Sequence, residues 1–558
     1  MATKSSPLRE GDWFRTAVFY EIPVRSFFDA NHDGIGDLLG VTEKLDYLAD
    51  LGVGALWLLP FYRSAWRDEG YDILDHYSVD PSLGSLADLV RLVEGAHARG
   101  IRVLGDLVTN HVSIDHRWFQ EARRDRASPF RSWFLWSDTG KEFSRTRVIF
   151  RDFERTNWTW DDVAGQYYFH RFYATQPDLN YDSPEVHREI LNVARFWLGQ
   201  GLDGFRCDAV PYLFKREGTR CQSLPEVHHF FHELRAMIDE EFPGAVLVAE
   251  ANQSVPETYQ YFGGGAEFQM VMHFPLMPNL FLALGEGDPR RIRHVLRATL
   301  PTPSGSGWAY FLRNHDEVTL EQVSDDEREM FLWLYCQDGR TVVNGGVRRR
   351  LAPMLEGDDD SVAMMIALGL SLPGAMFLYY GDEIGMGDRL DLPDRDGVRT
   401  PMQWDASPTG GFSRAPLSGL LRPPVTDPAY GPDRRNVAEQ RDRPDSLLAK
   451  VRTLLHVYRV HPTTFGPDGI HFVDPANPAV FAFWREGLTT RVLCLYNFSR
   501  EKVSGRVALD PALVDGPLTL AGTARARRDG DGLAYELDGR RFGWLEFPLP
   551  PRERPPSR

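Results

Sequence analysis

Gly204-Phe-Arg-Cys-Asp208-Ala-Val210 decides the fold, because a strand-like apolar run there delivers a carboxylate at its C-terminal end. The same order recurs in Val246-Leu-Val-Ala-Glu250 and in Phe311-Leu-Arg-Asn-His-Asp316, and the segment 106–111 also passes from apolar to polar residues. A β/α barrel places its active site at the C-terminal ends of its strands. Two carboxylates that face one pocket are the groups that glycosidic-bond chemistry requires. We therefore expect an enzyme that acts on sugars.

Short apolar runs alternate with helical patterns, such as 86–98 and 184–198, through the first four-fifths of the chain. Continuous apolar runs are typical of buried parallel strands, and their alternation with helices indicates βα units. The predicted strands are 17–22, 55–60, 101–107, 204–210, 246–250, 268–273, 309–312 and 375–380. The fold class is therefore α/β, a (β/α)8 TIM barrel formed by residues 1–111 and 182–445.

Two further units are expected. About ninety residues separate the third strand from Gly204, and their first part, 112–181, is dense in Trp, Phe, Arg and Asp. We expect this part to be an inserted lid, domain B, over the barrel mouth. Strand patterns without helices between them then predict an all-β sandwich over 446–550, either a structural flap on the barrel or a sugar-binding module. Residues 551–558 have the composition of a disordered tail.

Composition limits the partners and the compartment. Of 558 residues, 63 are Lys or Arg and 79 are Asp or Glu, so the formal charge is −16. This excess of acid argues against nucleic acid and against anionic membranes as partners. Four scattered cysteines and an N-terminus without an apolar core favour a reducing, cytoplasmic location. The oligomeric state, monomer or homo-oligomer, stays open.

One uncharged segment, 361–381, is long enough in principle to cross a bilayer. Pro373-Gly374 interrupts it after about three helical turns. We therefore interpret it as a barrel helix followed by a buried strand.

The residues around the acids indicate how they could act. Arg206 lies two positions before Asp208 and so on the same side of the strand, where its guanidinium would orient Asp208 and keep it ionised. Glu250 follows four apolar residues, so burial should raise its pKa toward that of a general acid. A single Asp at a strand end is commonly a helix cap or turn residue. Three acids on three strands favour catalysis.

The segments 106–111, 204–210, 249–252 and 313–316 resemble, in the same order, the signature segments of the α-amylase superfamily. The resemblance implies that Asp208 is the nucleophile and Glu250 the acid/base. Asp316 would hold the sugar hydroxyls in the distorted transition state. The first glucose subsite would be lined by His111, Arg206 and His315.

Two more segments carry the same resemblance. Asp68-Glu-Gly-Tyr71-Asp is similar to a pair that closes the pocket, with Tyr71 stacked on the sugar ring. Arg399, in Val-Arg-Thr-Pro-Met-Gln-Trp, would pair with Asp68. This motif implies an exo-acting member that holds one terminal glucose.

A narrower resemblance is to the trehalose synthase family, which interconverts maltose and trehalose. It is carried by the segments 176–181, 212–221, 273–278, 313–320 and 348–353. By this resemblance a glucosyl group becomes covalently bound to Asp208, and the released glucose turns within the closed site and attacks. The net reaction is intramolecular transglucosylation with retention, and minor hydrolysis to glucose competes with it.

Three residues are expected to hold the second glucose: Asn252, Glu317 and Arg147. A salt bridge between Arg147 and Glu317 would seal the pocket. The alternative is that the two residues form an ordinary surface pair.

Asp29-Ala-Asn31-His-Asp33-Gly-Ile-Gly-Asp37 offers closely spaced oxygen ligands with a glycine for a sharp turn. This pattern predicts a structural calcium ion (Ca2+). The alternative is an Asx-rich turn that caps the next helix. No organic cofactor is implied, because the chemistry needs only carboxylates.

The resemblance implies a second calcium site at Asn110, Asp178 and the carbonyl groups of Tyr212 and Leu213. Lys215 stands where the family has a carboxylate, and its ammonium group could occupy the place of the ion. Phe153 and Cys207 are further departures from the pattern.

Two other functions remain as alternatives. An exo-acting α-glucosidase would use the same three carboxylates and pass the glucosyl group to water. A barrel that has lost catalysis could serve as a scaffold, although the nucleophile and the acid are both present.

Overall fold

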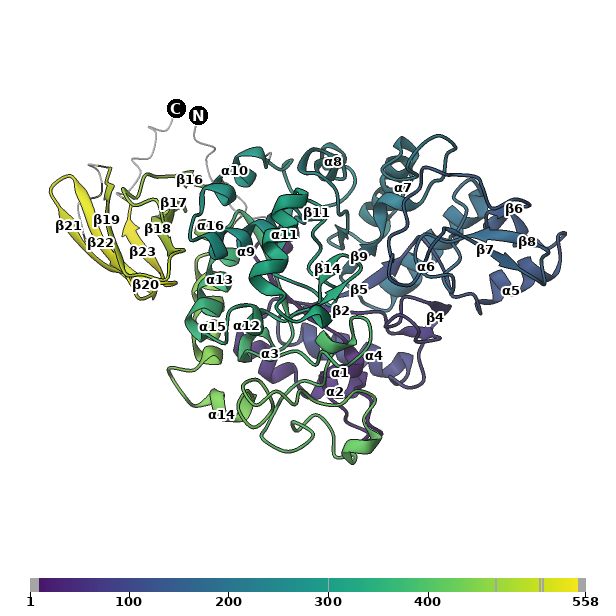
Figure 1. Cartoon of the computed structure of the whole chain (residues 1–558), viewed down its shortest axis with the longest axis horizontal. Coiled ribbons are helices and arrows are strands. Elements are labelled where there is room, and N and C mark those ends of the chain that lie inside the picture. Colours follow the sequence, from purple (N-terminus) through teal and green to yellow (C-terminus); the bar gives the residue numbers. More distant parts are fainter. Residues whose placement is uncertain (1–9, 300, 467–468, 511–512, 514–515, 550–558) are drawn as a thin grey trace.

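Eight parallel strands close into a barrel in a computed structural model of the chain, which describes residues 10–549 except 300, 467–468, 511–512 and 514–515 (Figure 1). Around the barrel the strand order is β1-β15-β12-β11-β10-β9-β5-β2. The strands are β1 Val18–Ile22, β2 Ala55–Leu58, β5 Arg102–Val108, β9 Gly204–Asp208, β10 Val246–Ala249, β11 Met270–Met272, β12 Gly307–Phe311 and β15 Gly374–Tyr379. Each overlaps one of the eight predicted runs, so the predicted barrel is confirmed.

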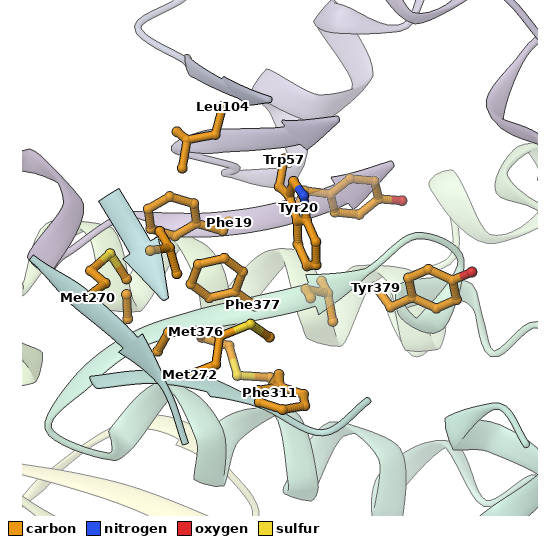
Figure 2. Close-up of a cluster of buried hydrophobic side chains, with 14 of the residues drawn as sticks. Phe19, Tyr20, Trp57, Leu104, Met270, Met272, Phe311, Met376, Phe377 and Tyr379 are labelled. Atoms are coloured by element: carbon orange, nitrogen blue, oxygen red, sulfur yellow. The ribbon is translucent and has the colours of Figure 1, made fainter. Parts of the chain in front are cut away.

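Large apolar side chains fill the barrel interior (Figure 2). The rings of Phe19 and Phe377, on neighbouring strands, stack with centroids 4.4 Å apart. Met270 and Met376 lie near them in the same cluster and are buried. Burying each such side chain contributes roughly 1.5–3 kcal/mol. The interior is therefore a packed core that holds the strand ends in fixed positions.

Helices follow the strands and form the outer layer. They are α1 Val24–Phe27, α2 Leu38–Glu43, α3 Leu45–Leu51, α4 Leu86–His97, α6 Pro184–Gly199, α7 Pro225–Glu241, α8 Val255–Gln260, α9 Leu276–Glu286, α10 Arg290–Ala298, α11 Asp325–Tyr335, α12 Leu351–Met354, α13 Asp359–Ser371 and α14 Val437–Arg441. The uncharged segment forms α13 and then β15, as predicted. Among the described residues, none of the helices combines the length and the apolar character needed to span a bilayer.

Between β5 and α6 the chain leaves the barrel and forms a small separate unit, at the right of Figure 1. It contains α5 Arg117–Arg124 and an antiparallel sheet of β6 Trp136–Ser137, β8 Gln166–Phe169 and β7 Trp158–Asp161. A smaller hairpin, β3 Tyr62–Ser64 with β4 Ile73–Val79, follows β2. Where the inserted chain returns, Asp178 forms a β-bridge with His111, and the Leu179 N–H donates to the Asn110 carbonyl at 2.8 Å. The insertion is thus anchored beside the carboxyl end of β5.

Two antiparallel sheets form the C-terminal unit, at the left of Figure 1. One contains β16 His471–Phe472, β17 Val480–Glu486, β18 Thr490–Asn497, β23 Phe542–Pro548 and β20 Leu518–Gly522, and the other contains β19 Val503–Ala508, β22 Gly532–Leu537 and β21 Arg525–Asp529. The predicted all-β module is present. Its first strand begins at His471, because α15 Leu447–Val460 and α16 Pro462–Phe465 fill the start of the predicted range 446–550. The tail predicted at 551–558 lies outside the described residues.

Candidate active site

The three acids converge at the carboxyl ends of their strands. Asp208 is the last residue of β9, Glu250 directly follows β10, and Asp316 lies five residues beyond β12. One cavity contains all three. Of the residues predicted from the sequence, its wall includes Asp68, Tyr71, His111, Arg147, Asp208, Glu250, Asn252, His315, Asp316 and Glu317.

Arg206 is the buried centre that joins the acids. Its Nη1 donates to Asp208 Oδ1 at 2.6 Å and to Asp106 Oδ1 at 2.8 Å, while Nη2 forms an ion pair with Glu250. The Arg206 side chain is only 1% exposed. The guanidinium therefore contacts Asp208 as expected from the spacing, and in addition holds the acid of the neighbouring strand.

Burial sets the proton affinities of the two central acids. It raises the pKa of Asp208 to about 6, against the opposing charge of Arg206. Burial also raises the pKa of Glu250 to about 7, although Arg206 and the Ala209 N–H, 3.0 Å from Oε2, act against the rise. Near neutral pH Asp208 therefore ionises before Glu250. This order suits a nucleophile beside a general acid.

Activity should follow a bell-shaped pH profile with its maximum between about 6 and 7. As pH falls below the lower value Asp208 gains a proton, and as pH rises above the upper value Glu250 loses one. Because the two groups interact, the limbs report the pair rather than single residues. The measurement is kcat/KM on maltose from pH 4.5 to 9 at constant ionic strength. A profile flat from pH 5 to 8 would contradict the assignment.

Asp316 is held by two arginines and a histidine. Its Oδ1 accepts from Arg395 Nη1 at 2.6 Å and Arg399 Nη2 at 3.1 Å, and Oδ2 lies 3.2 Å from His315 Nε2. Burial alone would raise the pKa of Asp316, but these neighbours hold the pKa well below its ordinary value. Asp316 is thus a permanent carboxylate, suited to accept hydrogen bonds from sugar hydroxyls.

The predicted pair of Arg399 with Asp68 is wrong. Asp68 Oδ1 instead accepts from Arg395 Nη2 at 2.7 Å. Arg399 is occupied elsewhere, since its Nε donates to the His315 carbonyl at 3.0 Å and its Nη2 to Asp316. Arg395, four residues earlier, is long enough to bridge Asp68 and Asp316.

Buried acids hold the aromatic wall of the cavity in place. Tyr71 stacks on His315 with ring centroids 5.4 Å apart and donates its hydroxyl to Asp106 at 3.1 Å. Glu21 Oε1 lies 2.6 Å from His315 Nδ1. Burial lowers the pKa of His111 to about 4 and that of His315 well below its ordinary value. Both imidazoles are therefore neutral near pH 7.

The ion pair at the outer rim differs from the one predicted. Arg147 Nη1 and Nη2 donate to the two carboxylate oxygens of Glu321, each at 2.7 Å, and not to Glu317. Asn252 Nδ2 donates to Glu321 Oε2 and to Thr319 Oγ1, both at 3.1 Å. Asn252 thus supports the ion pair from inside the cavity.

Glu317 faces the cavity rather than the rim. The next residue, Val318, pairs with Val347 in a β-bridge, which fixes the direction of the chain here. Burial raises the pKa of Glu317 to about 7. In the part of the chain that the structure describes, Glu317 Oε2 is buried without a hydrogen-bond partner. This oxygen is therefore free to bind a substrate hydroxyl.

Four residues that the sequence analysis did not name as site residues are essential to this arrangement. Glu21 and Asp106 could have been found, since each is an acid within the apolar, buried part of a strand. Arg395 and Glu321 lie in irregular or charged loops, where the sequence carries no comparable signal.

In the predicted calcium loop, the acids are engaged by the main chain. Asp29 accepts from the N–H groups of His32 at 2.6 Å and Gly34 at 2.8 Å, and Asp37 caps α2 through Gly40 at 2.6 Å. Among the described residues, no group of three His, Cys, Asp or Glu side chains is placed to hold a metal. These contacts are those of an Asx-rich turn. The predicted ligand set Asp29, Asn31, Asp33 and Asp37 stays a prediction.

The second predicted site holds an ammonium group. Lys215 Nζ lies 2.7 Å from Asp178 Oδ2 and donates to Asn110 Oδ1 at 3.2 Å and to the Leu213 carbonyl at 3.3 Å. Three of the four predicted ligands thus contact this one nitrogen.

Comparisons with known proteins show which family the chain belongs to. The family described as "Alpha amylase, catalytic domain" matches residues 21–464. A trehalose synthase/amylase of Mycobacterium tuberculosis is 47% identical over 555 residues, covering 98% of this chain and 92% of that protein. The trehalose synthase/amylase of Mycolicibacterium smegmatis is 50% identical over 502 residues, covering 88% and 84%.

Among solved structures, that of an α-glucosyl transfer enzyme, XgtA, has a TM-score of 0.79 at 31% identity, covering 96% of this chain and 99% of the other. The chain therefore belongs to the α-amylase family and, within it, to the trehalose synthases.

Proposed function

We propose that this enzyme interconverts maltose and trehalose by intramolecular transglucosylation. The observation that carries the proposal is the two-pronged ion pair of Arg147 with Glu321 in the wall of the cavity, which narrows the access of water. A hydrolase must admit water to its covalent intermediate, whereas a mutase must exclude it. The likeness to trehalose synthases supports the same reaction.

The first step breaks the glycosidic bond of maltose. An oxygen of Asp208 attacks the anomeric carbon of the non-reducing glucose, and Glu250 gives its proton to the departing glycosidic oxygen. A glucosyl–Asp208 bond forms, and free glucose remains in the cavity. Arg206, which contacts both acids, holds them in register for this step.

The second step forms trehalose. The trapped glucose turns, and its anomeric hydroxyl attacks the glucosyl carbon while Glu250 takes the proton. The bond to Asp208 breaks, and two inversions give net retention. Glu317 Oε2, which has no hydrogen-bond partner among the described residues, and the amide of Asn252 are the groups that would hold the turning glucose, since both residues line the cavity.

Opening the rim should shift the product from trehalose to glucose. In Arg147→Ala or Glu321→Ala, water would reach the glucosyl–Asp208 intermediate, and the ratio of glucose to trehalose should rise about three- to tenfold, equivalent to roughly 0.6–1.4 kcal/mol of barrier. Product ratios from maltose at low conversion measure this effect.

Arg145→Ala is the matched control for that prediction. Arg145 is two residues away and donates to the Gly218 carbonyl at 2.8 Å, not to Glu321. Its product ratio should stay that of the wild type. An unchanged ratio in both rim variants would show that the ion pair is not the water barrier.

Proton NMR of the enzyme with maltose tests the proposed function. Anomeric signals of α,α-trehalose in excess over free glucose would support the mutase. Glucose as the sole product would instead support the exo-acting α-glucosidase, which uses the same carboxylates. Incubation with trehalose should yield maltose, because both steps are reversible.

We also propose Ca2+ at the loop from Asp29 to Asp37, on the strength of its oxygen spacing. Transfer to EGTA should then lower the melting temperature by about 3–8 °C, since bound ligand stabilises only the folded state. Asp33→Asn should remove most of the calcium response. Asp445→Asn, at an exposed position, is the control. A wild-type melting temperature that is the same in calcium and in EGTA would exclude the ion.

A further inference from the structure

Lys215 is a buried lysine surrounded by oxygen atoms. Its side chain is 1% exposed, and its ammonium group contacts a carboxylate, a side-chain amide oxygen and a main-chain carbonyl at 2.7, 3.2 and 3.3 Å. Carboxylate, amide and carbonyl oxygens are also the ligands that Ca2+ prefers. The environment of this nitrogen is therefore that of a bound cation.

The three oxygens come from three separate parts of the chain. Asn110 follows β5 and precedes His111 of the cavity wall. Asp178 belongs to the returning segment of the inserted unit and forms an isolated β-bridge with His111. Leu213 follows the short 3-10 helix Val210–Tyr212, directly beyond Asp208. The ammonium group thus joins the lid, the β5 end and the loop behind the nucleophile.

The second calcium ion implied by the family does not fit this arrangement. Ca2+ lies about 2.3–2.6 Å from its oxygen ligands, and Lys215 Nζ already fills the space between three of the four oxygen-bearing residues. The charge balance of the site also argues against a calcium ion here. One ammonium balances the one carboxylate of Asp178, whereas a divalent ion would need a second carboxylate in its place.

We propose that Lys215 is a built-in cation, a positioning residue that takes the role of a metal ion and fixes the lid and the nucleophile loop around the cavity. The site is then independent of divalent metal in this chain. Because a glutamate with Ca2+ would restore the charge balance, Lys215→Glu should convert the position into a calcium site.

The experiment compares wild type, Lys215→Met and Lys215→Glu, each in EGTA and in 1 mM Ca2+. Calcium stoichiometry is measured by isothermal titration calorimetry, stability by thermal melting, and kcat and KM by total consumption of maltose. Total consumption serves because it does not depend on whether the product is trehalose or glucose. The calcium stoichiometry is independent of the proposed function altogether, and any ion at the Asp29–Asp37 loop contributes equally to all variants.

Lys215→Met should lose about 5–10 °C in melting temperature and at least tenfold in kcat, with no recovery in calcium, because Asp178 is left buried without its partner. In EGTA, Lys215→Glu should resemble Lys215→Met in melting temperature and kcat. In calcium it should bind one more ion than the wild type and regain most of its stability and kcat. Lys450→Met is the control, since Lys450 pairs with Asp360 at 2.5 Å between α13 and α15, outside the cavity.

Two results would overturn the proposal. One is a Lys215→Glu enzyme that binds no more calcium than the wild type, or that is insoluble with and without calcium. The other is a Lys215→Met enzyme with wild-type kcat and melting temperature. A Lys215→Glu enzyme that is soluble only when prepared in calcium would support the inference.

Discussion

Asp208→Asn should lower kcat on maltose by at least about ten-thousand-fold. Asparagine keeps the shape of the side chain, but its amide cannot form the glucosyl ester on which both steps of the proposed reaction depend. The fold should survive, because the amide oxygen can still accept from Arg206 Nη1, now 2.6 Å from Asp208 Oδ1. Rates are measured by NMR at high enzyme concentration, with thermal melting as the check on folding.

Asp203→Asn is the matched control for the nucleophile. Asp203 lies just before the same strand at the opposite end of the barrel, where it pairs with Arg102 at 2.8 Å. This variant should lose stability rather than rate. A folded Asp208→Asn enzyme with wild-type turnover would place the nucleophile elsewhere. If the wild-type enzyme converts maltose, an inactive Asp208→Asn enzyme would argue against the alternative of a non-catalytic scaffold.

Glu250→Gln should separate proton donation from bond formation. On maltose, kcat should fall by about a hundred- to ten-thousand-fold, because the departing glycosidic oxygen receives no proton. α-Glucosyl fluoride releases fluoride without protonation, so its first step should remain close to the wild-type rate. The covalent intermediate should then accumulate and appear in mass spectra as the addition of one glucosyl unit.

Glu257→Gln controls for the loss of a nearby carboxylate. Glu257 lies in the first turn of α8, seven residues beyond Glu250, and closes a capping box with Ser254. It should leave both substrates almost unaffected. If Glu250→Gln lowered the rate equally on maltose and on α-glucosyl fluoride, Glu250 would act by positioning the substrate and not as a general acid.

The barrel was predictable because its strands are buried on both faces and so appear as continuous apolar runs. Strand β21 carries no such signal, for the opposite reason. It reads Arg-Ala-Arg-Arg-Asp, lies at the edge of its sheet, and exposes most of its side chains. Charged residues on an edge strand protect the sheet from further pairing, and they also remove the apolar signal by which a strand is recognised.

The catalytic acids were predictable from their places at strand ends, whereas their partners were not. Both errors in pairing are shifts of four residues: Arg395 in place of Arg399, and Glu321 in place of Glu317. In each case two residues of like charge lie within one loop. Glu317, Glu321 and Arg395 line the cavity, and Arg399 contacts Asp316. Which one forms the ion pair depends on loop conformation, such as the β-bridge of Val318 with Val347. Residue spacing carries no information about that choice.

The helix α13 has a consequence for how the protein is made. All its residues from Ser361 to Ser371 are buried, partly because Tyr496 of the C-terminal sheet bonds to Ser371 at 2.7 Å and to the Ala367 carbonyl at 3.1 Å. On the ribosome this helix emerges well before that sheet, which is complete only at Pro548. Synthesis proceeds at about 5–20 residues per second, so the apolar surface of α13 stays uncovered by that sheet for roughly 10–35 s. During that interval, binding of a chaperone to this surface would protect the nascent chain from aggregation.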